Sequence, residues 1–262
     1  MTKIDLLQGD CLELMKDVPD ESIDLTVTSP PYDNLRSYNG NNEAWSETVW
    51  KAVIKELHRV TAEGGVVVWV VGDSTVNGSE TGTSFRQALH FKDVGFNLHD
   101  TMIWKKWSPF PDVTRYNNSF EYMFVLSKGR PKTVNLIKDK PNKSYKAKVG
   151  GSSREKNGTT RVLSGQKDGK TIAKYGTRLN VWENLPVMSS KERTGHPAQF
   201  PESLVEDHIL SWSNENDIVL DCFMGSGTTG VACKNLNRNF IGMELDEGYF
   251  KIATERINEV GE

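Results

Sequence analysis

The stretch I-V-L-D-C-F-M-G-S-G-T-T-G, residues 218–230, joins a buried strand, a glycine turn and the start of a helix. Glycines at 225 and 227 let backbone N–H groups approach a ligand closely, and Thr228 can begin the helix. Together with Gly230 they complete the pattern G-x-G-x-x-G of nucleoside-cofactor sites. A lysine-containing phosphate loop is excluded, because no Lys-Ser or Lys-Thr follows the glycines. The stretch therefore predicts an α/β domain with a cofactor at the end of this strand.

Two acidic residues near this loop narrow the kind of cofactor. Glu244 ends the next expected strand, near the position that binds ribose hydroxyls in dinucleotide sites. Asp221 precedes the glycines, where a carboxylate would repel a diphosphate but attract an ammonium group. S-adenosylmethionine carries an ammonium and no phosphate, whereas NAD carries a diphosphate and no ammonium. The charge of Asp221 therefore favours S-adenosylmethionine, while the glycine pattern alone leaves NAD open.

Strand-like runs alternate with helix-like runs along the chain, which is typical of a mainly parallel α/β sheet. The expected strands are Ile4–Leu7, Ile23–Thr28, Gly65–Val71, Leu98–Trp104, Tyr122–Ser127, Ile218–Asp221 and Phe240–Glu244. The expected helices are Glu47–Thr61, Ser84–Asp93, Pro201–Ser211, Thr228–Leu236 and Asp246–Val260. The pair Gly64-Gly65 is expected to end the first of these helices.

A second unusual stretch, T-S-P-P-Y at residues 28–32, overlaps the end of the expected strand Ile23–Thr28. Proline has a locked φ and no N–H for a sheet ladder, so the strand must stop and the loop must be rigid. The motif predicts either a merely stiff loop or a reaction site whose geometry has to be fixed.

Charge is unevenly distributed in this chain of 262 residues, whose formal net charge is −3. The segment from Lys128 to Arg178 holds fifteen Lys and Arg but only three acids, Asp139, Glu155 and Asp168. A basic segment on an acidic body indicates either a localised contact with a polyanion or a flexible, solvated loop.

Cysteine usage and hydropathy indicate the cell compartment in which the protein is expected. The three cysteines, Cys11, Cys222 and Cys233, form no C-x-x-C pair, which favours a reduced, cytoplasmic protein without a zinc site. The N-terminus reads as a strand and shows no signal-peptide apolar region. The longest apolar run, Val66–Val71, is too short to span a bilayer. We therefore expect a cytoplasmic protein that does not bind membranes.

Five short motifs together resemble those of β-class DNA amino-methyltransferases. They are G-D-C (9–11), T-S-P-P-Y (28–32), G-H-P-A-Q-F-P (195–201), D-C-F-M-G-S-G-T-T (221–229) and G-M-E-L-D (242–246). Their order also resembles that class, with the catalytic motif first, the cofactor loop last and a recognition segment between them. The resemblance implies a three-layer S-adenosylmethionine-dependent methyltransferase fold with a mostly parallel central sheet. Because the sheet of such enzymes starts at the cofactor strand, this chain would be circularly permuted, with its two ends close together on neighbouring strands.

The resemblance also implies site residues, which carry over motif by motif. The catalytic residues would be Ser29, Pro30, Pro31 and Tyr32. The Ser29 hydroxyl and the Pro30 carbonyl would accept from the target amine, and Tyr32 would stack on the flipped-out base. The residues implied to bind S-adenosylmethionine are Asp10 and Cys11 at the adenine, Glu244 at the ribose, Phe200, Asp221, Phe223, Gly225, Gly227 and Thr228 at the methionine, and Ser226 in the same loop. His196 is expected to be an ordinary loop or capping histidine.

The chemistry implied for this site is methyl transfer to an exocyclic base amine. The lone pair of that amine is delocalised into the ring, so fixed acceptors that favour a pyramidal nitrogen would help it attack. In this family, serine at the first motif position goes mostly with N4 of cytosine, and Asp or Asn mostly with N6 of adenine. Cytosine is therefore favoured and adenine is the alternative. Methylation at ring carbon is disfavoured, because none of the cysteines follows a proline.

Other functions remain open on the sequence alone. They are RNA or protein methylation on the same fold, an NAD-dependent oxidoreductase, and a nucleic-acid-binding module without catalysis. For the favoured function, residues 1–127 would form the catalytic part, 128–180 a basic target-recognition region, and 181–262 the cofactor-binding part of the same domain. The expected partner is double-stranded DNA; the resemblance suggests a homodimer and a cognate restriction endonuclease as further partners.

Overall fold

The computed structural model describes residues 2–31, 45–106, 113–163, 165, 168–183 and 199–260. The chain divides into two compact units. We call Met1–Asn135 with Asn180–Glu262 the main unit, and Leu136–Leu179 the basic unit. Within the described residues, no helix has the length and apolar character needed to cross a membrane.

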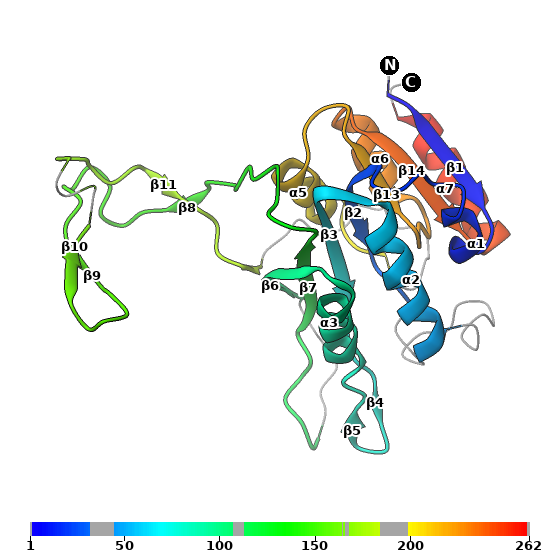
Figure 1. The fold of residues 1–262 in the computed structure, drawn as a ribbon, viewed down its shortest axis with the longest axis horizontal. Helices are drawn as coiled ribbons and strands as arrows, with labels where there is room; N and C mark the ends of the chain where they lie inside the picture. The colour runs from blue at the N-terminus through cyan, green and yellow to red at the C-terminus, as the bar shows by residue number, and fades with distance from the viewer. Residues whose placement is uncertain are drawn as a thin grey trace. The chain divides into compact units, whose positions relative to one another are not determined.

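A sheet of eight described strands forms the centre of the main unit (Figure 1). Its order is β1-β14-β13-β2-β3-β7-β6-β12. The bounds are β1 Ile4–Gln8, β2 Ile23–Thr28, β3 Thr61–Val71, β6 Asn97–Lys105, β7 Phe120–Ser127, β12 Val181–Trp182, β13 Ile218–Asp221 and β14 Asn239–Glu244. Strand β7 is antiparallel to both neighbours, and the other strand pairs of this sheet are parallel. The first strand pairs with the last, as the permuted motif order predicts.

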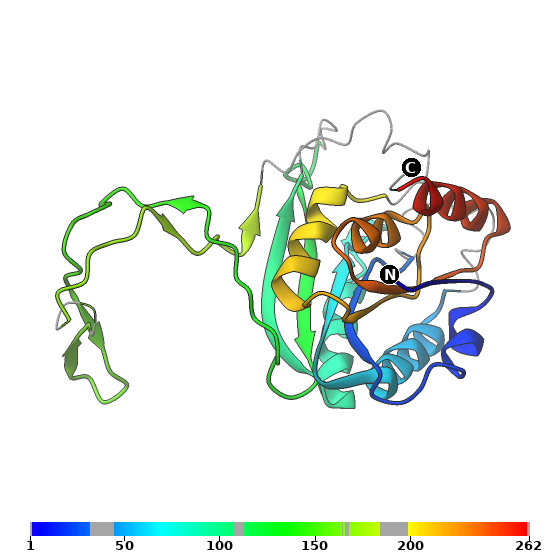
Figure 2. The ribbon, with the colours of Figure 1, turned by 90° about the horizontal axis from the view of Figure 1, so that it is seen from above.

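Helices cover both faces of this sheet and give the main unit three layers (Figure 2). One face carries α5 (Glu202–Trp212), α6 (Thr228–Asn235) and α7 (Glu247–Glu259), and the other carries α1 (Cys11–Met15), α2 (Glu47–Val60) and α3 (Thr83–Val94). Side chains of β3 alternate between the two layers. Val66, Val68 and Val70 belong to the core under α5, and Val67, Trp69 and Val71 to the core under α2. Burial on both faces explains why this strand is a continuous apolar run.

The strands and long helices predicted from the sequence are present, with ends that differ by a few residues. The prediction that Gly64-Gly65 ends the helix before β3 is wrong. Helix α2 ends at Val60, because both the N–H and the hydroxyl of Thr61 donate to the Leu57 carbonyl. The glycine pair lies inside β3, where the register with β2 shifts. Helix α1 was not predicted, since five residues are too few to show a helical period.

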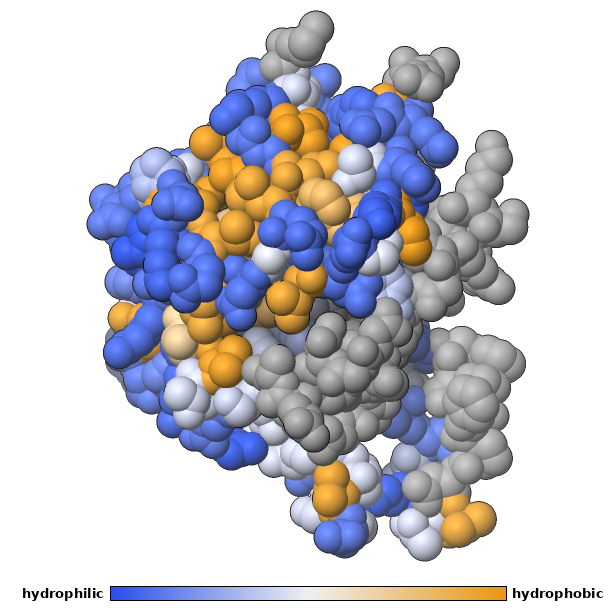
Figure 3. All heavy atoms as spheres, turned by 90° about the vertical axis from the view of Figure 1, so that its right-hand side faces the viewer, coloured by the Kyte–Doolittle hydropathy of each residue, from blue (hydrophilic) through white to orange (hydrophobic). Residues whose placement is uncertain are grey.

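Figure 3 shows apolar side chains on the face of the main unit that carries β1 and α7. These elements contribute the partly buried side chains of Ile4, Leu6, Phe250 and Val260. Partial exposure of this kind is common on folded proteins, whose accessible surface is largely apolar, so this face does not by itself define a binding surface.

The remaining short strands form antiparallel pairs. In the main unit, β4 (Thr75–Val76) pairs with β5 (Ser79–Glu80). In the basic unit, β8 (Lys140–Pro141) pairs with β11 (Tyr175–Gly176), and β9 (Ser152–Arg154) pairs with β10 (Thr160–Val162). An ion pair of 2.6 Å between Arg178 and Asp139 joins the two ends of the basic unit. Every lysine that the structure describes in this unit is exposed.

Candidate active site

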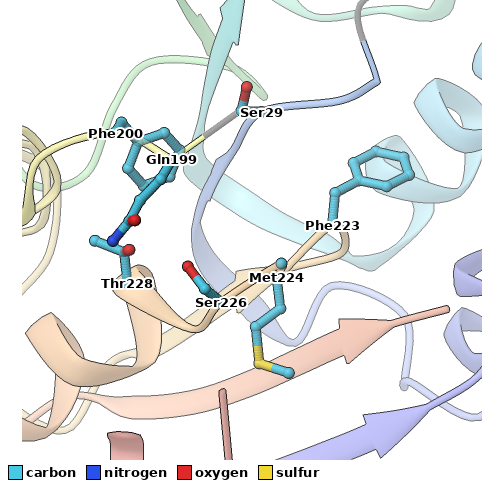
Figure 4. Close-up of a pocket in the computed structure, with 8 residues that line it drawn as sticks. Ser29, Gln199, Phe200, Phe223, Met224, Ser226 and Thr228 are labelled. Carbon is cyan, nitrogen blue, oxygen red and sulfur yellow. The ribbon is translucent and has the colours of Figure 1, made fainter. Parts of the chain in front are cut away.

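The carboxyl ends of β2 and β13 lie side by side near the middle of the sheet. From this pair the chain continues outward in opposite directions, from β13 to β14 and from β2 to β3, so the loops diverge and leave a crevice. A pocket lies there (Figure 4). Its lining consists of Ser29, Gln199, Phe200, Phe223, Met224, Gly225, Ser226 and Thr228. The strand order thus brings the serine of T-S-P-P-Y and the glycine loop to one cavity.

Two glycines of the loop are required by its geometry. Gly227 has φ +83° directly before α6, and a Cβ there would lie 2.9 Å from the Cβ of Ala253 on α7. At Gly230, inside α6, a Cβ would lie 2.3 Å from Cδ1 of Ile257. The first is needed for the turn and for packing, and the second for packing of α6 against α7.

Glu244 holds the glycine loop at Gly225. Its Oε2 accepts from the Gly225 N–H at 2.7 Å, and its Oε1 accepts from the Asp246 N–H at 2.8 Å. Burial raises the pKa of this carboxyl, and the two backbone hydrogen bonds oppose that shift. Each carboxylate oxygen has a further lone pair, so Glu244 can still accept hydroxyl groups of a ligand.

Asp221 is not among the residues that line the pocket and is only 1% exposed. Its Oδ1 accepts from the Thr28 hydroxyl at 2.6 Å and from the Phe223 N–H at 3.1 Å. Its Oδ2 accepts from the Thr229 hydroxyl at 2.6 Å. Burial raises the pKa of Asp221 to about 6, although these hydrogen bonds act in the opposite direction. The carboxylate therefore ties β2, the glycine loop and α6 together.

The predicted site residues fall into three groups. Ser29, Phe200, Phe223, Gly225, Ser226 and Thr228 line the pocket, whereas Asp10, Cys11, Pro30, Pro31, Asp221, Gly227 and Glu244 do not. Tyr32 and His196 lie outside the described residues. Asp10 is exposed at the end of β1, next to the strand of Glu244, and its Oδ1 accepts from the Leu12 N–H at 2.7 Å as the N-cap of α1.

Two lining residues, Gln199 and Met224, were not predicted as site residues. Both lie within the motifs quoted above: Gln199 directly precedes Phe200, and Met224 directly precedes Gly225. Figure 4 shows the Gln199 side chain directed toward Thr228. Adjacency to a predicted site residue was the available signal, but it does not tell which neighbour faces the cavity.

The cysteines do not supply a nucleophile. Burial, with a smaller contribution from Asp10, raises the pKa of Cys11 to about 12. Burial also raises the pKa of Cys222 and of Cys233 well above the usual value. All three thiols therefore stay protonated near neutral pH, which does not suit methylation through a cysteine adduct.

The fold has three layers, a glycine loop after β13 and an acidic residue at the end of β14. This is the fold of an S-adenosylmethionine-dependent methyltransferase. The chain belongs to the DNA methylase family N6_N4_Mtase, whose model matches residues 23–255. It is 52% identical over 253 residues to the orphan methyltransferase M.BamHII of Bacillus amyloliquefaciens, covering 93% of this chain and 92% of that one.

Solved structures show the same fold. The M1.HpyAVI–SAM complex superposes with a TM-score of 0.63 at 28% identity, covering 97% of this chain and 99% of that one. The PvuII DNA methyltransferase (cytosine-N4-specific) superposes with a TM-score of 0.71 at 22% identity, covering 100% and 89%. The protein is therefore a DNA methyltransferase of the N4/N6 amino-methyltransferase family, and its cofactor is S-adenosylmethionine rather than NAD.

Proposed function

We propose that this methyltransferase modifies double-stranded DNA at N4 of cytosine, with Ser29 and Pro30 holding the target amine. The observation that carries the proposal is that Ser29 lines the same pocket as Gly225, Ser226 and Thr228. In-line methyl transfer needs the amine and the methyl donor in one cavity at short distance. A pocket shared by the proline-rich corner and the glycine loop meets this requirement.

The chemistry of the pocket fits S-adenosylmethionine. No Lys or Arg is among the described residues that line it, whereas a diphosphate would call for a cation. Phe200 and Phe223 offer apolar walls, and Glu244 offers a half-buried acceptor for ribose hydroxyls. When bound, S-adenosylmethionine supplies an electrophilic methyl group on a sulfonium. In our proposal these residues hold the cofactor, together with the backbone from Gly225 to Thr228.

The chain itself contributes acceptors and rigidity. The Ser29 hydroxyl oxygen and the Pro30 carbonyl each accept one N–H of the amine, which favours the pyramidal nitrogen that attacks. A nitrogen–carbon bond forms as the carbon–sulfur bond breaks. The methylated nitrogen is then strongly acidic and releases its proton without a strong base. Pro30 and Pro31 have locked φ values, and the hydrogen bond from Thr28 to Asp221 anchors the residue before Ser29.

The choice of cytosine rests on the serine. A hydroxyl can both accept from the amine and donate to the ring nitrogen beside it, which is N3 in cytosine, whereas a carboxylate can only accept. Adenine presents the analogous N1 and is the alternative base, but in this family a serine at this position goes mostly with N4 of cytosine.

The basic unit supports the choice of DNA and its proposed role in target recognition. Residues 136–179 contain twelve Lys and Arg and three acids. The lysines described there are exposed and can contact phosphates, which positions a duplex without reading its sequence. We propose that the basic region 128–180 positions the target duplex for residues 1–127 and 181–262.

The test is incubation with methyl-labelled S-adenosylmethionine and mixed-sequence duplex DNA, followed by analysis of the nucleosides. Labelled N4-methylcytosine is the expected product. Labelled N6-methyladenine would overturn the choice of base and keep the site. Unlabelled DNA, under conditions where the protein binds the cofactor, would contradict the proposed activity.

A further inference from the structure

Arg256 of α7 joins the glycine loop, which lines the proposed cofactor pocket, to the start of α5. Its Nη1 donates to the carbonyl of Ser226, and the same nitrogen lies 3.4 Å from the Ser226 hydroxyl. Its Nη2 donates to Oε1 of Glu202 at 2.8 Å. Ser226 lines the pocket, and Glu202 opens α5 two residues after Phe200, which also lines the pocket. One guanidinium therefore holds two segments that are distant in the sequence.

The surroundings of Arg256 favour a fixed geometry. The side chains of Arg256 and Glu202 are 14% and 24% exposed, so their ion pair is largely shielded from solvent. Ser226 is 2% exposed. A planar guanidinium donates in fixed directions, and a shielded charge is costly to leave without its partner. The bridge should therefore resist a change in the separation of Ser226 and Glu202.

Packing of α7 sets where this guanidinium lies. Ala253 and Ile257, which flank Arg256 on the helix, lie against Gly227 and Gly230 so closely that a Cβ at either glycine would collide with them. This packing fixes the position of α7 relative to the glycine loop, and Arg256 reaches from α7 to α5.

We propose that Arg256 is a positioning residue for S-adenosylmethionine, setting the distance between the Ser226 loop and the Phe200 segment. The proposal rests on the proposed cofactor pocket and deepens it. Its consequence is that the last described helix, which does not line the pocket, controls cofactor affinity and leaves the DNA site unaffected.

The test compares Arg256→Met, which keeps the apolar stem but loses the donors, with Arg256→Lys, which keeps the charge. We expect Arg256→Met to weaken equilibrium binding of S-adenosylmethionine about tenfold or more. Its KM for the cofactor should rise similarly, with the KM for DNA within about twofold of the parent value. Arg256→Lys should recover part of the loss, because an ammonium can still pair with Glu202. A merely structural role would not separate the two KM values.

The matched control is Lys251→Met on the same helix, whose ion pair with Glu247 is exposed at 67% and 72%. It should bind the cofactor like the parent. If Arg256→Met fails to fold, Glu202→Ala takes its place, since it removes the acceptor on α5 and leaves the bond to Ser226. Parent-like cofactor binding in whichever of these two variants is folded would overturn the proposal.

A further variant, Glu244→Ala, separates failure of this proposal from failure of the pocket assignment. Loss of cofactor binding in Glu244→Ala, with full binding in Arg256→Met, would refute the role of Arg256 alone. Full binding in both variants would place the cofactor elsewhere and refute the proposed pocket as well.

Discussion

The Thr28 hydroxyl donates to the buried carboxylate of Asp221 at 2.6 Å, so the last residue of β2 is joined to the last residue of β13. Thr28 directly precedes Ser29, and Asp221 directly precedes the glycine loop. This side-chain hydrogen bond therefore connects the strand ends that carry the proposed catalytic corner and the proposed cofactor loop. Both side chains are almost completely buried, at 0% and 1% exposure, so water cannot replace either partner.

Thr28→Val tests this connection, because valine has nearly the same shape and no hydroxyl. The buried carboxylate loses a donor, so the free energy of unfolding should fall by about 1–3 kcal/mol. We expect kcat to fall about tenfold, since Ser29 loses its anchor. Thr28→Ser, which keeps the hydroxyl, should recover most of both losses. Urea unfolding and methyl transfer at saturating substrates measure the two effects, and a fully active, fully stable valine variant would show that the bond positions nothing.

Asp221 should make stability depend on pH. Burial raises its pKa from 3.8 to about 6, so the folded state holds this proton more tightly than the unfolded state. The stabilisation from the bound proton is complete below the unfolded pKa and is lost as pH rises through the folded pKa. The expected change is on the order of 3 kcal/mol between pH values near 4 and near 7.

Asp221→Asn isolates this effect, because an amide keeps the shape and does not titrate in this range. Its oxygen can still accept from Thr28 and the Phe223 N–H, while its NH2 group would donate to the Thr229 hydroxyl, which donates to Asp221 in the parent. The difference in free energy of unfolding, parent minus Asp221→Asn, should decrease as pH rises across that window. Urea unfolding at a series of pH values gives this difference. An increase instead would mean that the folded protein favours the ionised carboxylate.

Ser29→Ala should impair chemistry and spare cofactor binding. Removing one fixed acceptor from the site of amine attack is expected to lower single-turnover methyl transfer on the order of a hundredfold. Equilibrium binding of S-adenosylmethionine should change little, because the side chain is only one small part of the pocket lining. Ser22→Ala is the matched control: this serine lies just before β2 and donates to the Pro19 carbonyl in an exposed turn. Parent-level transfer by Ser29→Ala would remove the serine from the mechanism.

Gly230→Ala should destabilise the fold, although alanine is normally the better helix former. The new Cβ would lie 2.3 Å from Cδ1 of Ile257 and 2.8 Å from Cε1 of Phe240, so α6 and α7 would have to separate. Overpacking of this kind costs about 1–3 kcal/mol, which exceeds the gain in helix propensity of about 1 kcal/mol. The melting temperature should therefore fall. At Gly150 an added Cβ would meet nothing within 4 Å, so Gly150→Ala should melt like the parent, and equal melting of both variants would contradict this packing.

Several parts of the fold could be predicted because their signals are local. Strands β2 and β13 match their predicted ranges, since each is a short apolar run with a sharp end. The end of α2 could not be predicted, because Thr61 closes the helix through its own side chain and leaves Gly64-Gly65 to the strand. Glycine is thus a weak marker of a boundary where another residue can already satisfy the last carbonyl.

The candidate site was only partly predictable for a related reason. Motif residues such as Gly225 and Phe200 were found from short patterns, and they do line the pocket. Gln199 was not predicted, because a sequence does not tell which residue of a loop faces the pocket. Arg256 was not predicted either, because its contacts with Ser226 and Glu202 exist only after α7 has packed on the glycine loop.

The sequence by itself determined the long helices and the main strands, the proline corner, the glycine turn and the family, because each of these depends on residues that are close together in the chain. Only the tertiary structure decided that Asp221 is enclosed by Thr28, Phe223 and Thr229, and that Arg256 joins Ser226 to Glu202. The physical reason is that these contacts follow from strand order and helix packing. Thr28 and Asp221 are 193 positions apart, and only the pairing of β2 with β13 brings them within hydrogen-bonding distance.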